Sequence, residues 1–558
     1  MKRPPTDPAG IPRRRSWPWV PPGAPRRWWI LPPPPPTEEV EAYQFQQLQQ
    51  TLVGRWLALN EIESEPRDVV VVPSLSMDGF QLAAIPGITH YEERMLFTLG
   101  LLRHPRARLV FVTSQPLHPA MLDYYLALIG GIPTAHARNR LTLISCYDTS
   151  PRPLTEKVLE RPRLMRRIRD SIDPARAHMT VFTVSERERS LAVRLGIPLY
   201  GVDPKLLHLG TKTGSRQVFR EAGIPMAPGF EDLRNENQVA EAITDLWESD
   251  PTLQRFVVKL NQGFSGEGNA VLPVSPALRA AAPGNASRSA RVDAVLAALP
   301  GLRFMGPTET WERFRSALGE IGGVVEAFIE GDTKRSPSVQ LRINPRGQLQ
   351  AMSTHDQLLG GPDGQLYLGC RFPADGAYRR QIQADALKVG AVLQERGCVG
   401  RVAVDFVTVQ KPDGSWSRHA IEINLRMTGT THPIMTMKLL NDGEYDDESG
   451  LYITRRGEPR YYMSTDNLMQ PHYRGLLPDD VLDIAAVHDV HYQPWKETGV
   501  VFHLLGAVSQ FGKVGLTAIG SSPEEAEDFF VRAERALDAA TLGSARTPGA
   551  ARPGDSKG

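Results

Sequence analysis

The sequence predicts a protein of class α/β and α+β, in which an open α/β domain is followed by an α+β region and a small C-terminal α+β domain. Apolar strand patterns alternate with helical patterns up to about residue 205, which is typical of a largely parallel sheet. From about residue 206, helices mix with long strands that alternate polar and apolar side chains. The chain has 558 residues, of which 41% are hydrophobic and 23% charged, so several globular domains are expected.

The first domain should begin at Glu38, where the sequence first resembles an ordered protein. Helical periodicity predicts helices over residues 38–56, 91–102 and 119–129. Short apolar runs, the first of them rich in valine, predict buried strands over residues 69–73, 108–113 and 180–184. Alternation of these two kinds of element is the basis for the α/β assignment.

The charge balance and the cysteines exclude several classes of protein. The 64 basic and 63 acidic residues leave a formal net charge of +1, so neither nucleic acid nor a membrane is expected as a partner. No apolar run approaches the roughly 18 residues that a membrane-spanning helix needs. Cys146, Cys370 and Cys398 are far apart, which argues against a disulfide framework or a cysteine zinc site and predicts a cytoplasmic setting.

Low-complexity segments at both ends set the outer boundaries of the ordered chain. The first is rich in Arg and Pro and the last in small residues, so both are expected to be disordered tails. The predicted division is a tail, an α/β domain, a central domain, a C-terminal domain and a tail, over residues 1–37, 38–205, 206–440, 441–542 and 543–558.

Three further expectations concern the central and C-terminal domains. Residues 275–285 are rich in Ala, Pro and Ser and are expected to form an exposed loop. Residues 442–449 are predicted to form an acidic loop. A closing helix should begin at Pro523, with acidic residues in its first turn, and its buried stripe is predicted to contain Phe529, Phe530, Ala533 and Leu537.

A predicted β-hairpin carries the strongest chemical signal. Its period-two alternation gives each strand one polar face, with Arg401, Ala403 and Asp405 on the first strand and Glu422, Asn424 and Arg426 on the second. Opposed Cβ atoms in such a hairpin lie about 4.5–5.5 Å apart. Asp405, Glu422 and Asn424 would then present oxygen donors suited to Mg²⁺ on one surface. The alternative is an ordinary hairpin with a solvated polar face.

A lysine at the end of an apolar strand precedes a glycine-rich loop. Lys259 is followed by Gly263, Gly266 and Gly268. Glycines let backbone N–H groups approach phosphate oxygens, and the lysine adds positive charge. The loop lacks the Gly-Lys-Ser/Thr of a P-loop, and Glu267 replaces the last glycine of a nucleophile elbow, which excludes a serine hydrolase. An ordinary glycine turn is the alternative.

Two shorter segments extend this pattern. Lys212 lies near the start of a predicted helix, where a positive charge is unfavourable unless an anion is near. Glu326 lies on an apolar strand whose backbone groups and carboxylate suit an adenine ring, although an edge strand is the simpler interpretation.

Taken in order, these segments resemble the ATP-grasp superfamily over about residues 206–440. The preceding α/β region is similar to a pre-ATP-grasp domain. The runs Thr-Gly-Thr-Thr-His-Pro at 428–433 and Gly-Val-Val-Phe-His-Leu-Leu-Gly at 499–506 extend the resemblance to the pheganomycin-type peptide ligases. That resemblance covers nearly all of the ordered chain.

The resemblance implies an ATP-dependent carboxylate–amine ligase that forms a peptide bond through an acylphosphate, releases ADP and phosphate, and acts in peptide natural-product biosynthesis. It implies ATP with Mg²⁺, or Mn²⁺, as cofactors. The implied ATP contacts are Lys212, Lys259, Gly263, Ser265, Gly266, Gly268, Glu326, Ala327 and Ile329. The implied metal ligands are Asp405, Glu422 and Asn424, and the implied catalytic cations are Arg401 and Arg426.

Contacts to the small-molecule carboxylate and amine substrates are harder to assign. The candidates are His355, Gln357, Thr431 and His432, although each histidine fits a structural role equally well. Two other functions remain open: an ATP-grasp ligase of another substrate class, such as one for a non-peptide carboxylate or in cofactor synthesis, and a non-catalytic nucleotide-binding regulatory protein. The complete set of metal-type residues argues against the second.

Overall fold

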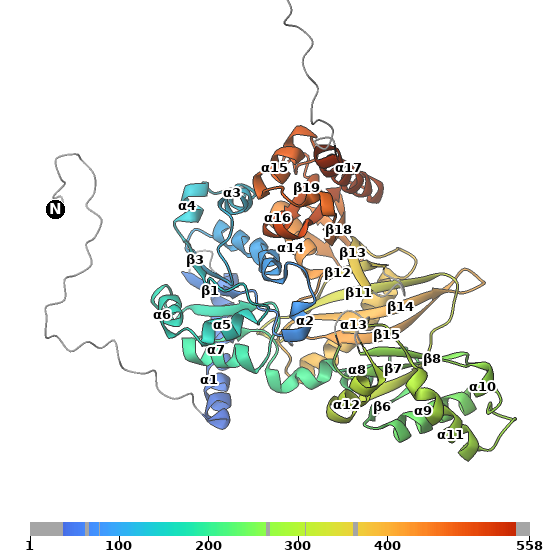
Figure 1. Cartoon of the computed structure of the whole chain (residues 1–558). Coiled ribbons are helices and arrows are strands. Elements are labelled where there is room, and N and C mark those ends of the chain that lie inside the picture. The colour runs from blue at the N-terminus through green and yellow to red at the C-terminus, as the bar shows by residue number, and fades with distance from the viewer. Residues whose placement is uncertain are drawn as a thin grey trace, which may run out of the picture.

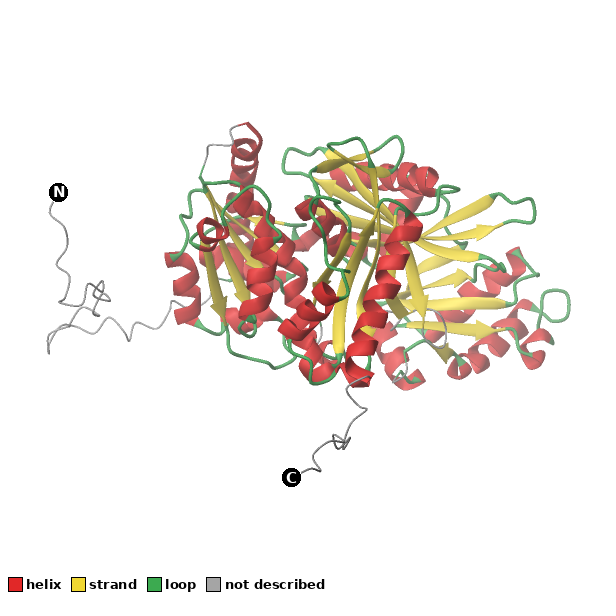
Figure 2. Cartoon of the chain, turned by 90° about the horizontal axis from the view of Figure 1, so that it is seen from above, coloured by secondary structure: helices red, strands yellow, loops and turns green. Residues whose placement is uncertain are grey.

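The computed structural model describes residues 37–61, 66–77, 79–263, 268–306, 309–360 and 366–542. The predicted tails therefore lie outside the described residues, apart from Thr37. Figure 1 shows an N-terminal domain, a central region with a separate green lobe, and C-terminal elements above the centre. Seen from above, the strands form the inner layers and most helices lie on their outer faces (Figure 2).

The N-terminal domain contains a five-stranded parallel sheet in the order β3-β2-β1-β4-β5. In chain order its strands are β1 (Arg67–Val72), β2 (Ala107–Thr113), β3 (Leu141–Ser145), β4 (Ala177–Val181) and β5 (Leu199–Tyr200). The parallel pairing confirms the predicted open α/β domain. The strand predicted over 180–184 begins three residues earlier, and β3 and β5 were not predicted.

Alternate side chains of this sheet enter different cores. Val69 and Val71 pack with the 3₁₀ helix η2 (Ile88–Arg103) and with α3 (Pro119–Ala127), in a core that continues into the C-terminal strands. Val70 and Val72 face the opposite side. The helices on that side are α1 (Glu38–Glu61), α5 (Leu154–Leu159), α6 (Pro162–Asp170) and α7 (Glu186–Leu195), and the short helices of the domain are α2 (Gly79–Ala83) and α4 (Thr134–Arg138).

The green lobe of Figure 1 is a second sheet, antiparallel, in the order β6-β10-β7-β8-β9. Its strands are β6 (Gly229–Leu233), β7 (Arg255–Leu260), β8 (Asn269–Pro273), β9 (Arg303–Phe304) and β10 (Gly323–Ala327). Its helices are α9 (Glu236–Ser249), α10 (Pro276–Arg279), α11 (Arg288–Ala298) and α12 (Trp311–Ile321). The expectation of a loop over 275–285 is therefore wrong for α10, where Ser275 caps the helix by accepting a hydrogen bond from the Leu278 N–H.

The largest sheet has ten strands and is the framework of the molecule. The strands that come from the middle of the chain are β11 (Lys334–Ile343), β12 (Leu349–Gly360), β13 (Leu366–Phe372), β14 (Gly400–Gln410) and β15 (Trp416–Asn424). Its later strands are β16 (Gly443–Asp446), β17 (Leu451–Thr454), β18 (Pro459–Met469), β19 (Gly499–His503) and β20 (Lys513–Gly520). The associated helices are η3 (Pro204–Gly210), α8 (Lys212–Glu221), α13 (Arg379–Glu395), α14 (Thr431–Leu440), α15 (Pro478–Val487), α16 (Val508–Phe511) and α17 (Pro523–Leu542).

The C-terminal segment shares this sheet with the central region. β18 pairs with β13 and with β20, so the sheet continues past residue 440 without interruption. The predicted acidic loop contains a strand, β16, which pairs with β17. In α17, Ala533 and Leu537 are buried as predicted, whereas Phe529 and Phe530 are only partly buried at the edge of the core.

Packing of the green lobe depends on a single large side chain. Trp247 of α9 is fully buried, and its ring meets the Phe256 ring of β7 edge-on at 6.0 Å. Trp247→Ala should therefore destabilise the lobe by about 3–5 kcal/mol. Hydrogen exchange of the β7 and β8 amides should accelerate by two to three powers of ten, since about 1.4 kcal/mol is tenfold.

Trp495→Ala is the matched control, because this side chain is 65% exposed and its removal should change stability by less than about 0.5 kcal/mol. Equal exchange rates in the two variants would contradict the importance assigned to Trp247.

Candidate active site

The β14–β15 hairpin brings the predicted metal ligands together. Asp405 lies opposite Glu422 and Ala403 lies opposite Asn424, and the pairing shifts by one residue between Asp405 and Phe406. Asn424 Nδ2 donates to Asp405 Oδ2 at 3.0 Å. From β12, Gln357 Nε2 donates to Asp405 Oδ1 at 3.2 Å, so this substrate candidate lies beside the carboxylates. We call Asp405, Glu422, Asn424 and Gln357 the carboxylate cluster.

The two carboxylates of the cluster differ in their electrostatic surroundings. Burial would raise the pKa of Glu422, but Lys212, Arg426 and a hydrogen bond with Asn424 together outweigh burial and lower it. Burial, with repulsion from Glu422, raises the pKa of Asp405 to about 6. Lys212 and Arg426 both lie near these acids, and the repulsion that remains between the two acids favours the approach of a further cation.

The donor set fits a hard divalent cation. Carboxylate and amide oxygens from Asp405, Glu422 and Asn424 are the ligand types that Mg²⁺ and Mn²⁺ prefer in proteins. The raised pKa of Asp405 supports the fit, because a bound cation would offset the repulsion that raises it.

A second acid in the site is held by two cations. Glu326 of β10 is buried, and its oxygens accept from Lys259 Nζ at 2.6 Å and from Arg216 Nη1 at 2.7 Å. Burial would raise the pKa of Glu326, but Lys259 and Arg216 lower it below its usual value. Sequence reasoning missed Arg216, although it lies four residues after Lys212 and therefore on the same face of α8.

The backbone after Glu326 is partly engaged within the protein. Ala327 N–H donates to Pro228 O at 2.9 Å, and Ile329 O accepts from Lys334 Nζ at 2.5 Å. The Ala327 N–H and the Ile329 carbonyl, whose residues are predicted to contact an adenine ring, therefore each have a hydrogen-bond partner within the protein.

The glycine loop is described only at its two ends. Gly263 is described, and Ser265 and Gly266 lie outside the described residues. Gly268 has φ of +75°, a conformation that glycine adopts without strain, and its N–H donates to Glu309 Oε2 at 2.9 Å. The loop therefore leaves β7 and enters β8 close to Lys259, because Lys259 pairs with Asn269 across these strands.

The two arginines predicted to be catalytic lie in different places. Burial lowers the pKa of Arg426. Attraction to Glu422 and Asp405, which lie within electrostatic reach, partly offsets this effect. Arg401 is the second residue of β14, four residues before Asp405 and thus about 13–14 Å along the strand. Its guanidinium lies 3.0 Å from Met435 Sδ. This position argues against the predicted role of Arg401 beside the carboxylates.

His355 and Thr431 are held by interactions inside the protein. His355 is fully buried and hydrogen-bonded to the Tyr462 hydroxyl, and burial lowers the pKa of its imidazole to about 3. Thr431 Oγ1 donates to Gln340 Oε1 at 2.9 Å, which fixes the loop that precedes α14. Both positions are those of structural residues rather than of substrate contacts.

His432 belongs to a buried polar chain that sequence reasoning missed. Its Nε2 lies 3.1 Å from His503 Nδ1, and His503 Nε2 lies 2.7 Å from Asp466 Oδ1. Arg94 Nη1 donates to the other Asp466 oxygen at 3.0 Å. The two histidines were noted only as isolated residues, because their partners are far away in sequence.

The raised pKa of Asp405 has a consequence for stability. The Asp405 carboxyl binds a proton more tightly in the native state than in the unfolded chain, where the pKa of Asp is near 3.9. The free energy of unfolding therefore falls as pH rises from about 4 to about 6. Asp405→Asn removes that loss. Without divalent ions at pH 8, calorimetry should find the variant more stable by up to about 2–3 kcal/mol, with a smaller gain at pH 5.

The control for this prediction is Asp442→Asn, which removes an exposed acid paired with Arg455 and should have little effect at either pH. A gain for Asp405→Asn that is larger at pH 5 than at pH 8 would contradict the assigned direction.

Comparisons with known proteins agree with this geometry. A family model described as IQCH-like, ATP-grasp matches residues 204–294 and 304–448. The model of the PGM1 C-terminal domain matches residues 480–530. Among the described residues, no helix has both the length and the apolar character needed to cross a membrane.

Relatives extend the match over most of the chain. The L-propargylglycine--L-glutamate ligase of Streptantibioticus cattleyicolor is 34% identical over 465 residues, which cover 82% of this chain and 91% of that protein. IQ motif-containing protein H of Danio rerio is 26% identical over 400 residues, and the match covers 65% of this chain but only 37% of that protein.

A solved structure shows the same fold. The biotin carboxylase domain of the Hydrogenobacter thermophilus 2-oxoglutarate carboxylase superposes with a TM-score of 0.50 at 13% identity, covering 84% of this chain and 89% of that one. At this identity the similarity concerns the fold alone. Together with the bacterial relative and the family model, these findings show that the chain belongs to the ATP-grasp family of ligases.

Proposed function

We propose that the protein is an ATP-dependent carboxylate–amine ligase that forms a peptide (amide) bond and releases ADP and phosphate. One observation carries the proposal: Lys212 forms an ion pair with Glu422 of the carboxylate cluster, and Lys259, from a separate element, forms one with Glu326. A site that activates a carboxylate with ATP needs cations for phosphate and acids for a metal ion. In this chain the two kinds of group already lie in contact.

In this proposal each residue has a defined task. Lys212 and Lys259 bind the phosphates of ATP, together with the glycine loop. Asp405, Glu422 and Asn424 hold Mg²⁺, which neutralises phosphate oxygens when it is bound. Arg426, close to Glu422 and Asp405, orients the reacting carboxylate and stabilises the oxyanion formed when the amine attacks.

The chemistry requires that the carboxylate be activated. Attack of an amine on a free carboxylate would have to expel oxide, whereas transfer of the γ-phosphoryl group gives an acylphosphate with phosphate as the leaving group. Water must be kept from this intermediate, a task that we assign to the glycine loop beside Lys259.

We also propose that the domain boundaries lie at residues 205 and 440, as the sequence predicted.

The substrates are proposed to be amino acids or short peptides. The relative from Streptantibioticus is named for joining two amino acids, L-propargylglycine and L-glutamate. By analogy, this chain would act in peptide natural-product biosynthesis.

The activity can be tested with Mg-ATP and a pooled set of amino acids and short peptides. ADP should appear only when the pool is present. Lys259→Ala and Glu422→Gln should each lower its rate of release by about 10²–10³, because Lys259 balances the charge of the transferring phosphoryl group and Glu422 would hold the metal ion that does the same. Chromatography separates ADP from AMP and measures both.

Lys205→Ala and Glu448→Gln are matched controls, since both side chains are exposed, and they should keep the rate of the unaltered protein. Release of AMP in place of ADP would replace the acylphosphate route with an adenylate. Absence of ATP binding by calorimetry would overturn the proposal.

A further inference from the structure

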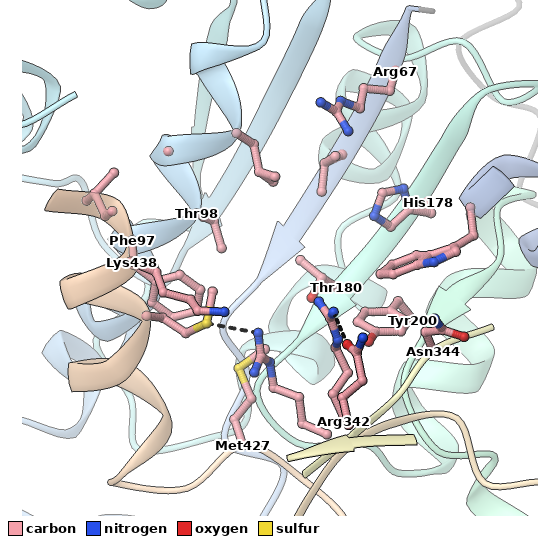
Figure 3. A pocket seen from close by; sticks show the side chains of 18 of the residues that line it. Arg67, Phe97, Thr98, His178, Thr180, Tyr200, Arg342, Asn344, Met427 and Lys438 are labelled. Carbon is pink, nitrogen blue, oxygen red and sulfur yellow. Dashed lines mark hydrogen bonds between the residues drawn. The ribbon is translucent and has the colours of Figure 1, made fainter. Parts of the chain in front are cut away.

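A cavity of about 440 Å³ lies between the N-terminal domain and the large sheet, away from the carboxylate cluster. Figure 3 shows Arg67 and His178 reaching into it from β1 and β4, and Lys438 reaching in from α14 on the other side. Arg342 and Arg401 enter from β11 and β14. The cavity is therefore enclosed by elements from two domains.

The charge of this cavity is strongly one-sided. Three arginines named above and Lys438 line it, with Arg103 at its edge, and no carboxylate is present among its described lining residues. Burial, with repulsion from Arg342 and Arg401, lowers the pKa of Lys438 to about 8. Cations brought together in this way repel one another, and such an arrangement is stabilised only when an anion joins it.

Four residues of the cavity wall each contain a buried polar atom without a hydrogen-bond partner. These atoms are the indole Nε1 of Trp56, the Nε atoms of Arg67 and Arg342, and the hydroxyl of Tyr200. A buried polar group left without a partner costs about 1–3 kcal/mol. Four such atoms in the side chains around one cavity show that the protein supplies few partners for polar groups in this region.

The walls also have a flat, apolar part. The rings of Trp56 and Tyr200 stack with centroids 5.2 Å apart, and the Arg342 guanidinium lies 5.8 Å from the Trp56 ring centroid. Phe97 and Met435 complete the apolar surface. The volume is within the range of about 300–1,000 Å³ that is typical of small-molecule sites.

The cavity is separate from the proposed active site. Its contacts come from the first residues of β14 and of β1, whereas Asp405 lies about 13–14 Å further along β14. Neither Lys212, Lys259 nor any member of the carboxylate cluster lines it. A ligand of this cavity would therefore be bound independently of the phosphates of ATP.

We propose that this cavity binds a small organic polyanion, a molecule with two or more phosphate or carboxylate groups on a flat or apolar body. The arginines and Lys438 neutralise its acidic groups through charged hydrogen bonds. The stacked Trp56 and Tyr200 rings cover its body. Because the cavity joins two domains, the bound ligand holds them together, and the site does not depend on the proposed ligase activity.

Two probes distinguish a ligand that carries phosphate groups from one that carries carboxylate groups. Inorganic tripolyphosphate and benzene-1,3,5-tricarboxylate are titrated by calorimetry into the full chain at low ionic strength, with excess Mg-ADP present to fill the ATP site. Benzene-1,3,5-tricarboxamide is the neutral counterpart of the second probe. At least one anionic probe should bind, the tricarboxamide should not, and added salt should weaken binding.

Variants assign the binding to this cavity. Arg342→Gln and Arg67→Gln should each lower the affinity for the probe by about tenfold or more, since each removes a charged hydrogen-bond donor. Arg346→Gln, an exposed arginine on the turn after β11, should bind as the unaltered protein does. Lys259→Ala should also retain probe binding, which separates this site from the ATP site.

A measurement on the unaltered protein guards against variants that fold poorly. Phenylglyoxal modifies arginines, and mass spectrometry should find Arg67, Arg342 and Arg401 protected when the probe is bound, with Arg346 modified equally in both states. The proposal would be overturned if neither anionic probe binds. It would also be overturned if both arginine variants keep their affinity for the probe, or if the bound probe does not protect these arginines.

Discussion

The buried ion triad of Glu326 with Lys259 and Arg216 is the interaction on which the geometry of the site depends. It joins β10, β7 and α8, the elements that connect the green lobe to the large sheet. Removing one member of a buried charge pair costs about 3–5 kcal/mol, because the remaining charge has lost its partner. The triad therefore fixes Lys259 relative to α8, and so relative to Lys212 at the start of that helix.

The site and the cavity differ in how their charges are balanced. In the site, Lys212 is paired with Glu422 and Lys259 with Glu326, so the protein alone neutralises both lysines. A ligand that brings a metal ion and phosphate together can replace each of these pairs without leaving a net charge. In the cavity, by contrast, the cations have no acid among the described lining residues, so an anion alone completes it. The same chain thus contains two sites that favour ligands of different net charge.

Local patterns predicted the elements that carry the chemistry. The alternation around Asp405 and Glu422 predicted a hairpin with both acids on one face, but the one-residue shift of the pairing after Asp405 was not predictable from it. The apolar run before Lys259 likewise became β7. Asp466 and Arg94 could not be predicted in this way, since their contacts join residues 372 positions apart in the sequence. Arg401 shares a strand face with Asp405, and only the packing of α14 shows that it faces another pocket.

The position of Arg426 depends on contacts from all three parts of the ordered chain. Met427, the next residue, donates its N–H to Phe182 O of the N-terminal domain at 3.0 Å. The Arg94 guanidinium lies 4.4 Å from the Phe182 ring centroid and is held by Asp466 of β18. Because Asp466 also contacts His503, and through it His432 of α14, a shift of any one part would move the others. The C-terminal strands therefore help to position Arg426, the residue proposed to orient the reacting carboxylate.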